Sequence, residues 1–190
     1  MGYEDMSSTI TPLGIAALAL LAERPMHPYE MYQLLIHRKD DRVVKVRPGS
    51  LYHTIDRLAA QGLMRATGTE RDGNRPERTT YELTEPGQLA LAERVAEMLA
   101  TPINEYPEFP LAISQAHNLP KKTVIDLLKR RYVRMGSELD AVAASFNAVE
   151  EKKIARKYWL DLTYQRALLD AELAWIERLI ADIESGAIDW

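Results

Sequence analysis

The sequence contains no cysteine, which excludes disulfides, thiolate nucleophiles and thiolate metal sites and suits a reducing cytosol. It also lacks a long apolar run. The longest unbroken stretch, about residues 13–22, is well short of the roughly 20 residues that a membrane span needs. The N-terminal residues, MGYEDMSS, carry acids and no lysine or arginine, unlike a secretory signal. We therefore predict a cytoplasmic protein without a membrane partner.

Residue patterns of catalytic and metal sites are also missing. The only histidines are His27, His37, His53 and His117, and no two have the i,i+4 spacing of a helical metal site. A glycine pair at 68 and 73 has the spacing of a phosphate-binding loop, but Asn74 and Arg75 replace its Lys-Ser/Thr. No Gly-x-Ser-x-Gly motif occurs, and no carboxylate pair stands out. We predict that the protein is not an enzyme and has no cofactor or metal.

Proline is unevenly distributed and divides the chain into three regions. Residues 102–120 contain four of the ten prolines, whereas residues 121–190 contain none. Residues 121–190 have the uninterrupted pattern of long helices. We predict a first domain at residues 1–101, an irregular connector at 102–120 and a helical dimerisation domain at 121–190.

The first region reads as a series of short elements. Helical spacing and helix-start signals predict helices over about 12–23, from Pro28 to about 36, and over 48–62, with Gly62 as the stop. A short extended segment over 43–46 precedes the third helix. Strands are predicted at 63–67 and 79–83 with Asp72 and Gly73 at their turn, followed by a helix over about 86–100. The fold class is mainly α with a small β-hairpin, and the order is that of a winged helix-turn-helix.

Charge is concentrated in this region. The net charge is −4, yet residues 37–78 hold ten lysines and arginines against six acids. Such a basic island indicates a phosphate-binding face. A solvated surface of mixed charge is the alternative, and charge alone favours it.

The helix over 48–62 is the candidate reader of a DNA major groove. Its apolar edge, Leu51, Ile55, Leu58 and Ala59, would pack inward. The side chains that remain outward or lateral can contact phosphates or base edges, although each alone is an ordinary surface residue and Tyr52 could instead pack partly. They are Ser50, Tyr52, His53 and Arg57.

The predicted hairpin adds a cationic tip. Arginine is favoured in narrow, negative minor grooves and along phosphate ridges. An ordinary polar hairpin is the alternative, but reader helix and wing support each other because they occur in the order of one fold. The candidate wing contacts are Arg71, Asn74, Arg75 and Arg78.

These residues resemble a known family. The segments HPYEMYQLL, RPGSLYHTIDRLAAQGLM and RPERTTYELTEPGQ, with EFPLAI at 108–113, are similar to PadR-family transcriptional regulators. The resemblance implies a dimeric cytoplasmic regulator, usually a repressor, often relieved by a small molecule such as a phenolic acid or a drug. It places Tyr29, Ser50, Tyr52 and the wing near Arg75 at or beside double-stranded DNA, and His53 at a variable position. A winged-helix protein-interaction module without DNA binding is the alternative, which the wing arginines oppose.

The last 70 residues predict two long helices with too much apolar area to bury on each other. Apolar side chains recur at spacings of three and four over 121–146, and in a heptad pattern from Ala155 to Ile183 that Arg166 interrupts. We predict a homodimer on a pseudo-palindromic operator, although part of this area could pack on the same chain's first helices. Aromatic side chains here could also hold a small aromatic effector, although an aromatic stripe is more often core. The candidate pocket residues are Tyr132, Trp159 and Trp175.

Overall fold

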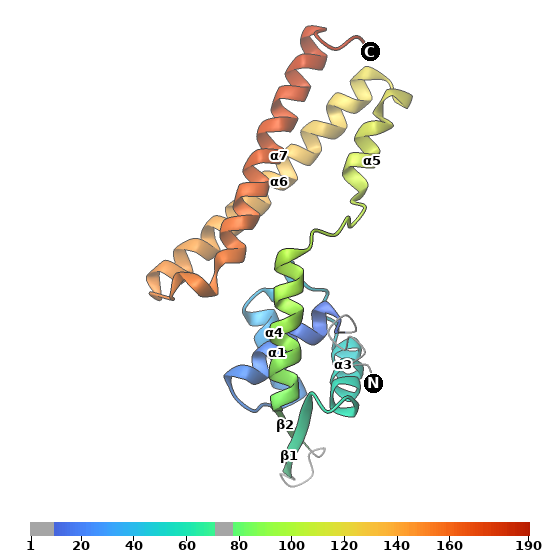
Figure 1. Ribbon diagram of the computed structural model, residues 1–190. Coiled ribbons are helices and arrows are strands. Elements are labelled where there is room, and N and C mark those ends of the chain that lie inside the picture. Colours follow the sequence, from blue (N-terminus) through green and yellow to red (C-terminus); the bar gives the residue numbers. More distant parts are fainter. Residues whose placement is uncertain (1–9, 71–77) are drawn as a thin grey trace. The chain divides into compact units, whose positions relative to one another are not determined.

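The computed structural model describes residues 10–70 and 78–190. The chain forms two compact units, Met1–Asn104 and Glu105–Trp190 (Figure 1). The connector predicted over 102–120 is divided between them, and most of it belongs to the second unit. Each unit is described separately below.

The N-terminal unit has the predicted order of helices and strands. The fold class predicted from the sequence, mainly α with a β-hairpin, is confirmed (Figure 1). The elements are α1 (Pro12–Glu23), α2 (Pro28–His37), the 3-10 turn η2 (Asp40–Arg42), α3 (Pro48–Ala60), β1 (Met64–Glu70), β2 (Arg78–Leu83) and α4 (Glu85–Ala100).

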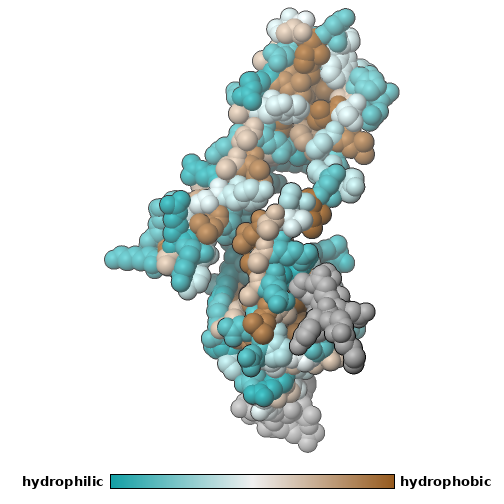
Figure 2. All heavy atoms as spheres, in the orientation of Figure 1, coloured by the Kyte–Doolittle hydropathy of each residue, from teal (hydrophilic) through white to brown (hydrophobic). Residues whose placement is uncertain are grey.

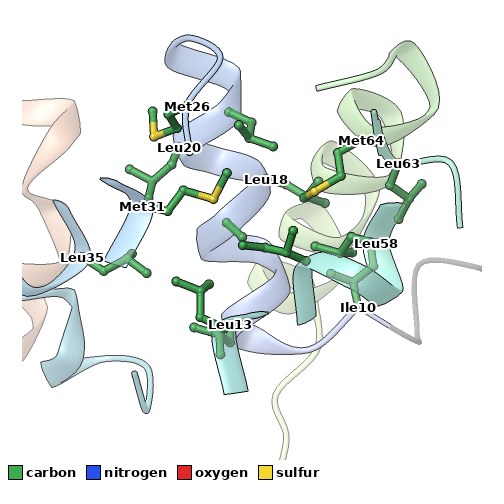
Figure 3. Close-up of a cluster of buried hydrophobic side chains, with 14 of the residues drawn as sticks. Ile10, Leu13, Leu18, Leu20, Met26, Met31, Leu35, Leu58, Leu63 and Met64 are labelled. Atoms are coloured by element: carbon green, nitrogen blue, oxygen red, sulfur yellow. The ribbon is translucent and has the colours of Figure 1, made fainter. Parts of the chain in front are cut away.

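Helix α1 is the centre of this unit. It is apolar on nearly every side, as expected for a helix that others surround, and it contacts α2, α3, α4 and β2. Thr11 begins the helix, and its Oγ1 accepts a hydrogen bond from the amide of Gly14 at 3.3 Å. Figure 3 shows the buried side chains that gather around α1, including Leu18, Leu58 and Met64.

The ends of α2 and α3 set the path of the helix-turn-helix. Gly62 has a φ of 73° and its amide donates to the carbonyl of Ala59, which confirms the predicted stop of α3. The extended segment predicted over 43–46 is wrong at its start. Lys39 adopts a left-handed conformation, and the amides of Val43 and Val44 both donate to the carbonyl of Asp40, which makes a turn there.

The hairpin is joined to the rest of the unit on both sides. Its strands are antiparallel, with Met64 opposite Leu83, and Met26 forms an isolated antiparallel bridge with Tyr81. After β2, Thr84 caps α4 by accepting from the amide of Gly87 at 3.1 Å. A side chain at Gly87 would meet the carbonyl oxygen of Leu63 at 1.9 Å, so only glycine lets α4 approach the start of the hairpin. The turn predicted at Asp72–Asn74 lies outside the described residues.

The C-terminal unit is a long helical hairpin with a short helix beside it. It contains α5 (Glu108–Ser114), the 3-10 turn η3 (Ala116–Asn118), α6 (Lys121–Glu151), the 3-10 turn η4 (Arg156–Tyr158) and α7 (Leu160–Ser185). Helices α6 and α7 run antiparallel, since Lys129 pairs with Glu184 and Arg131 with Glu172 (Figure 1). Their shared core consists of Val124, Leu128, Met135, Leu173, Ile176 and Ile183.

One helix boundary differs from the prediction. Ala155 and Trp159, expected inside the last helix, precede it, and α7 begins at Leu160. Lys153 has a φ of 52° and ends α6, and the indole of Trp159 donates to the carbonyl of Ile154 at 3.0 Å. Local hydrogen bonds therefore build a turn where the apolar spacing alone favours a continuous helix. Within the described residues, no helix is both long and apolar enough to cross a membrane.

Helix α5 is held against the hairpin by an aromatic and ionic cluster. The guanidinium of Arg131 lies 3.6 Å from the ring centre of Phe109, and it also pairs with Glu172. Trp175 meets the Phe109 ring edge-on at 6.2 Å between ring centres. The indole of Trp190 donates to the carbonyl of Leu119 at 2.9 Å, which fastens the residues after α7 to the segment before α6.

Candidate nucleic-acid interface

Helix α3 separates buried from exposed side chains as its spacing predicts. Leu51, Ile55 and Leu58 are fully buried, which confirms the predicted inner edge. The four candidate reader residues, Ser50, Tyr52, His53 and Arg57, are exposed, and Tyr52 exposes 46% of its surface. The polar side of the helix is therefore open to a ligand, and its apolar edge fixes its orientation.

The start of α3 suits an anion. Pro48 is the first helical residue, Arg47 makes no side-chain cap, and no acid lies in the first turn. The amides of the first turn are left for an external acceptor, and the helix dipole adds positive potential there. Thr54 donates to the carbonyl of Ser50 at 2.8 Å, so its polar side chain is satisfied internally.

Arg57 is less free than its sequence position suggests. Its Nη2 donates to Oγ1 of Thr11 at 3.1 Å, and this oxygen also caps α1. The side chain thus links the candidate reader helix to the start of α1, although Arg57 as a whole is exposed. Tyr29, in the first turn of α2, exposes 61% of its surface.

The candidate wing residues lie mostly outside the described part of the chain. This holds for Arg71, Asn74 and Arg75, whereas Arg78 begins β2 opposite Glu70. The base of the wing is well fixed. The Met26 amide donates to the Tyr81 carbonyl at 3.0 Å and the Tyr81 amide to the Met26 carbonyl at 3.1 Å.

The basic island is smaller than a count of charges indicates. Arg38 donates two hydrogen bonds to the carboxylate of Glu23, and the two residues lie 15 positions apart in the chain. The hydrogen bond from Arg38 lowers the pKa of Glu23 and raises the pKa of Arg38. Arg65 likewise pairs with Glu82 across the hairpin. These two arginines stabilise the unit and are not free for phosphate.

Two bases that the sequence did not single out remain available. Lys45 and Arg47 are exposed, and neither has an ion pair within residues 10–70 and 78–190. They lie directly before the anion-favouring start of α3. Their place next to a Pro-initiated helix is the sequence signal that would have identified them.

The candidate effector residues are not all brought together. Trp159 packs edge-on against Phe146 at the turn between α6 and α7, whereas Trp175 packs against Phe109. Trp159 directly precedes α7, and Trp175 lies fifteen residues after the first residue of this helix, about 22 Å along its axis. Tyr132 follows Arg131, whose partner Glu172 places it at the level of Trp175. No cluster of acids and histidines that could hold a metal occurs among the described residues.

Comparison with protein families supports the resemblance deduced from the motifs. Residues 17–93 match the model of the Transcriptional regulator PadR-like family. The predicted resemblance is thereby confirmed over the segment that contains α2, α3, the hairpin and most of α1 and α4. Comparison with the curated proteins gave no match.

Solved structures share the fold over nearly the whole chain. Bacillus subtilis PadR in complex with operator DNA is 20% identical, with a TM-score of 0.76 over 90% of this chain and 97% of that one. The same protein in complex with p-coumaric acid is 20% identical, with a TM-score of 0.71 over 90% and 98%. A PadR-like transcriptional regulator from Bacillus cereus is 15% identical, with a TM-score of 0.66 over 92% and 99%. Both units thus follow a known arrangement of helices and hairpin.

Proposed function

We propose that this chain, whose residues 17–93 match the model of the PadR-like family, binds double-stranded DNA in a sequence-specific manner and represses transcription as a homodimer. The observation that carries the proposal is the two-sided α3, which buries its apolar edge and exposes Ser50, Tyr52, His53 and Arg57. A helix of this kind enters the major groove in helix-turn-helix proteins.

The DNA contacts divide by chemistry. The start of α3, with Arg47 and Lys45 before it, supplies cations and free amides for phosphates. Tyr52 and His53, on the exposed side of α3, supply hydrogen-bonding groups for base edges. Arg75 and its neighbours in the wing follow the adjacent backbone or minor groove. Tyr29 contributes a further phosphate contact from α2.

The homodimer is supported by apolar surface on the helical unit. Figure 2 shows hydrophobic residues at the surface between hydrophilic ones. On α7, Tyr164 and Leu168 expose 66% and 52% of their surfaces, although both lie within a long helix. Such a surface is typical of an interface that a partner chain covers. Two copies then present two α3 helices to a pseudo-palindromic operator.

Release of the DNA by a small aromatic effector completes the proposed role. The support is the structural likeness to Bacillus subtilis PadR, which is known in complex with p-coumaric acid. In this chain, Trp175 and Tyr132 lie at one level of the hairpin beside α5, and Trp159 lies at its far end. Trp175 and Tyr132 are therefore the better candidates for one effector site.

Salt-dependent binding tests the DNA contacts. Fluorescence anisotropy with DNA from upstream of the protein's own gene should show binding. The logarithm of the binding constant should fall linearly with the logarithm of the salt concentration. Arg75→Ala should weaken binding to all sequences and flatten this slope by about one unit for a lost phosphate contact. Arg130→Ala, which removes an exposed arginine from α6, is the matched control and should leave the slope unchanged. Equal slopes for Arg75→Ala and the unaltered protein would contradict this role.

The alternative function is a winged-helix module that binds another protein and not DNA. The same titration separates the two, because such a module shows no saturable binding to the upstream DNA. Repeating the titration with a library of small aromatic compounds tests the effector. A compound that lowers the affinity supports release, and an unaffected affinity throughout contradicts it.

A further inference from the structure

Helix α5 is the first helix after the segment that joins the two units, and a single row of side chains holds it in place. No residue of α5, all of which the structure describes, is fully buried. Phe109 and Ile113 of α5, and Ala116 of the following turn, pack on the core of α6 and α7, and each is half-buried. Their spacings of four and three residues place them on one side of the segment.

Phe109 makes the most specific of these contacts. The guanidinium of Arg131, on α6, lies 3.6 Å from the centre of its ring. This guanidinium is fixed in turn by Glu172 on α7, whose carboxylate accepts a hydrogen bond from Nε of Arg131 at 2.8 Å. Trp175, also on α7, meets the ring edge-on. One ring of α5 therefore connects this short helix to both long helices.

Helix α5 depends on this docking for its helical form. It contains seven residues, and Pro107, which precedes it, provides no side-chain cap. Isolated helices of fewer than about 12 residues are only marginally stable in water. Elements with few buried contacts also open at a low cost in free energy. Release of the Phe109 ring should therefore unfold α5 as well as detach it.

The docked and released states differ in the length of the joining segment, the chain between the end of α4 and the first residue held on the hairpin. With α5 docked, this segment is residues 101–107, which is seven residues. With α5 released, the next fixed point is Leu119, whose carbonyl accepts a hydrogen bond from the indole of Trp190. The joining segment is then residues 101–118, which is eighteen residues. Fully extended, the two lengths reach about 24 Å and about 62 Å.

The length of the joining segment affects DNA binding when one dimer holds two half-sites. Once one N-terminal unit is bound, the other binds at an effective concentration that the connecting chain sets. This concentration falls roughly as the −3/2 power of the chain length, so an increase from seven to eighteen residues in both copies lowers it about fourfold. A longer segment also lets the two units reach half-sites at a wider range of spacings.

We propose that Phe109, by docking α5 against Arg131 and Trp175, keeps the joining segment short and so acts as a positioning residue for binding to two half-sites. The inference rests on the proposed DNA-binding homodimer and goes beyond it. It assigns a part in operator affinity and in the preferred half-site spacing to a residue outside the N-terminal unit.

Phe109→Ala in the full-length protein tests this role. The probes are two DNA duplexes, one that the unaltered protein selects from a random library and the same duplex with one half-site scrambled. Anisotropy should show that Phe109→Ala binds the intact duplex about fourfold more weakly and the scrambled duplex equally well. Insertion of about five base pairs, half a helical turn, between the half-sites should cost the variant less affinity than it costs the unaltered protein.

Phe146→Ala is the matched control, because Phe146 is the only other phenylalanine of the chain. It also packs edge-on against a tryptophan, Trp159, but it lies near the end of α6, far along the chain from the joining segment. This variant should keep the affinity ratio of the two duplexes and the spacing dependence of the unaltered protein. Phe109→Tyr, which retains the ring, should also keep both.

A second variant tests the length of the joining segment without altering the docked cluster. Insertion of eleven glycine and serine residues after residue 104 lengthens the segment from seven residues to eighteen and retains Phe109. It should reproduce both effects of Phe109→Ala. Circular dichroism checks the fold of each variant, and the insertion decides the outcome if Phe109→Ala is not folded.

The possible results separate the inference from the function on which it rests. An unchanged affinity ratio and spacing dependence in Phe109→Ala or in the insertion variant would overturn the inference. Equal changes in Phe146→Ala and Phe109→Ala would also overturn it, because they would show a general loosening of the hairpin. If the unaltered protein selected no duplex, or bound the intact and scrambled duplexes equally, the proposed DNA-binding homodimer would itself be refuted.

Discussion

The two units of this chain enclose their cores in different ways. In the N-terminal unit, four elements close around α1 and leave few of its side chains in contact with solvent. In the C-terminal unit, α6 and α7 bury one face against each other, and Tyr164, Leu168 and Trp175 remain on the outside. Burial of apolar area is the main favourable term in folding. The core around α1 is therefore closed, although α4 exposes Leu89, Met98 and Leu99, whereas the second unit has an exposed apolar face on a helix of its core.

In the proposed function, each unit has a separate task. The core of the first unit holds α3 in one orientation, which the proposed reading of a fixed DNA sequence by its polar side requires. In the proposed homodimer, the exposed apolar face of the second unit joins two copies, which sets the distance between the two α3 helices. Affinity for DNA then depends on both, because the second α3 binds at a high effective concentration once the first is bound.

Removing the second unit should have the largest effect. A fragment of residues 1–104 should stay folded, since its core lies within this range, and it should be a monomer. Loss of the second half-site contact should lower the affinity for operator DNA about 100-fold or more. Circular dichroism, sedimentation and anisotropy measure the three properties. An unchanged affinity of the monomeric fragment would contradict the division of tasks.

Substitution of one glycine should break the closed core. Gly87→Ala places a carbon 1.9 Å from the carbonyl oxygen of Leu63, so α4 must move away from the hairpin. We expect a loss of about 1–3 kcal/mol or more in the free energy of unfolding, measured by urea denaturation.

The matched control is a glycine in the C-terminal unit. Gly136→Ala, in the middle of α6, meets no atom within 4 Å and should gain about 1 kcal/mol from helix propensity. Equal effects of the two substitutions would show that the approach of α4 to Leu63 is not a constraint.

Acidification should weaken the N-terminal unit slightly. The pKa of Glu23 is held below its ordinary value of about 4.5 by the hydrogen bond from Arg38. A carboxylate with a lowered folded-state pKa stabilises the fold above its unfolded pKa, and this stability is lost as pH falls through the folded value. Glu23→Gln should therefore reduce stability at pH 7 and reduce the loss between pH 5 and pH 3.

The control for this change is an exposed glutamate of the same unit. Glu93→Gln, on α4, removes a carboxylate that has no ion pair within the described residues. Thermal unfolding across this pH range should be the same for Glu93→Gln and the unaltered protein. A pH profile for Glu23→Gln that matches both would mean that the Arg38 pair contributes nothing.

The elements of the first unit were predictable because their signals are local. Thr11, Pro12 and Gly62 mark helix ends within a few residues, and the spacing of Leu51, Ile55 and Leu58 identifies the buried edge of α3. The prediction that the last helix includes Ala155 and Trp159 was wrong because the turn there depends on the Trp159 indole and on a left-handed Lys153, which no helical period reveals.

Which basic side chains of the candidate site already have partners was harder to predict than which segment forms the site. Arg57 and Thr11 form a hydrogen bond although they lie 46 positions apart in the chain, and Arg38 and Glu23 do so although they lie 15 positions apart. Such pairs are set by the tertiary fold, so a count of charges in one segment includes arginines that are already bound. Lys45 and Arg47, which form no ion pair within residues 10–70 and 78–190, stand out only when those partners are known.

Selection from a random DNA library tests the central claim most directly, because it reports reading and pairing together. The full-length protein should enrich pseudo-palindromes whose half-sites are about one helical turn, or a multiple of it, apart. Tyr52→Ala should keep the spacing and relax the sequence at positions within each half-site. The account would be contradicted if the full-length protein enriched single half-sites or no sequence at all. It would also be contradicted if the full-length protein and Tyr52→Ala enriched identical sequences.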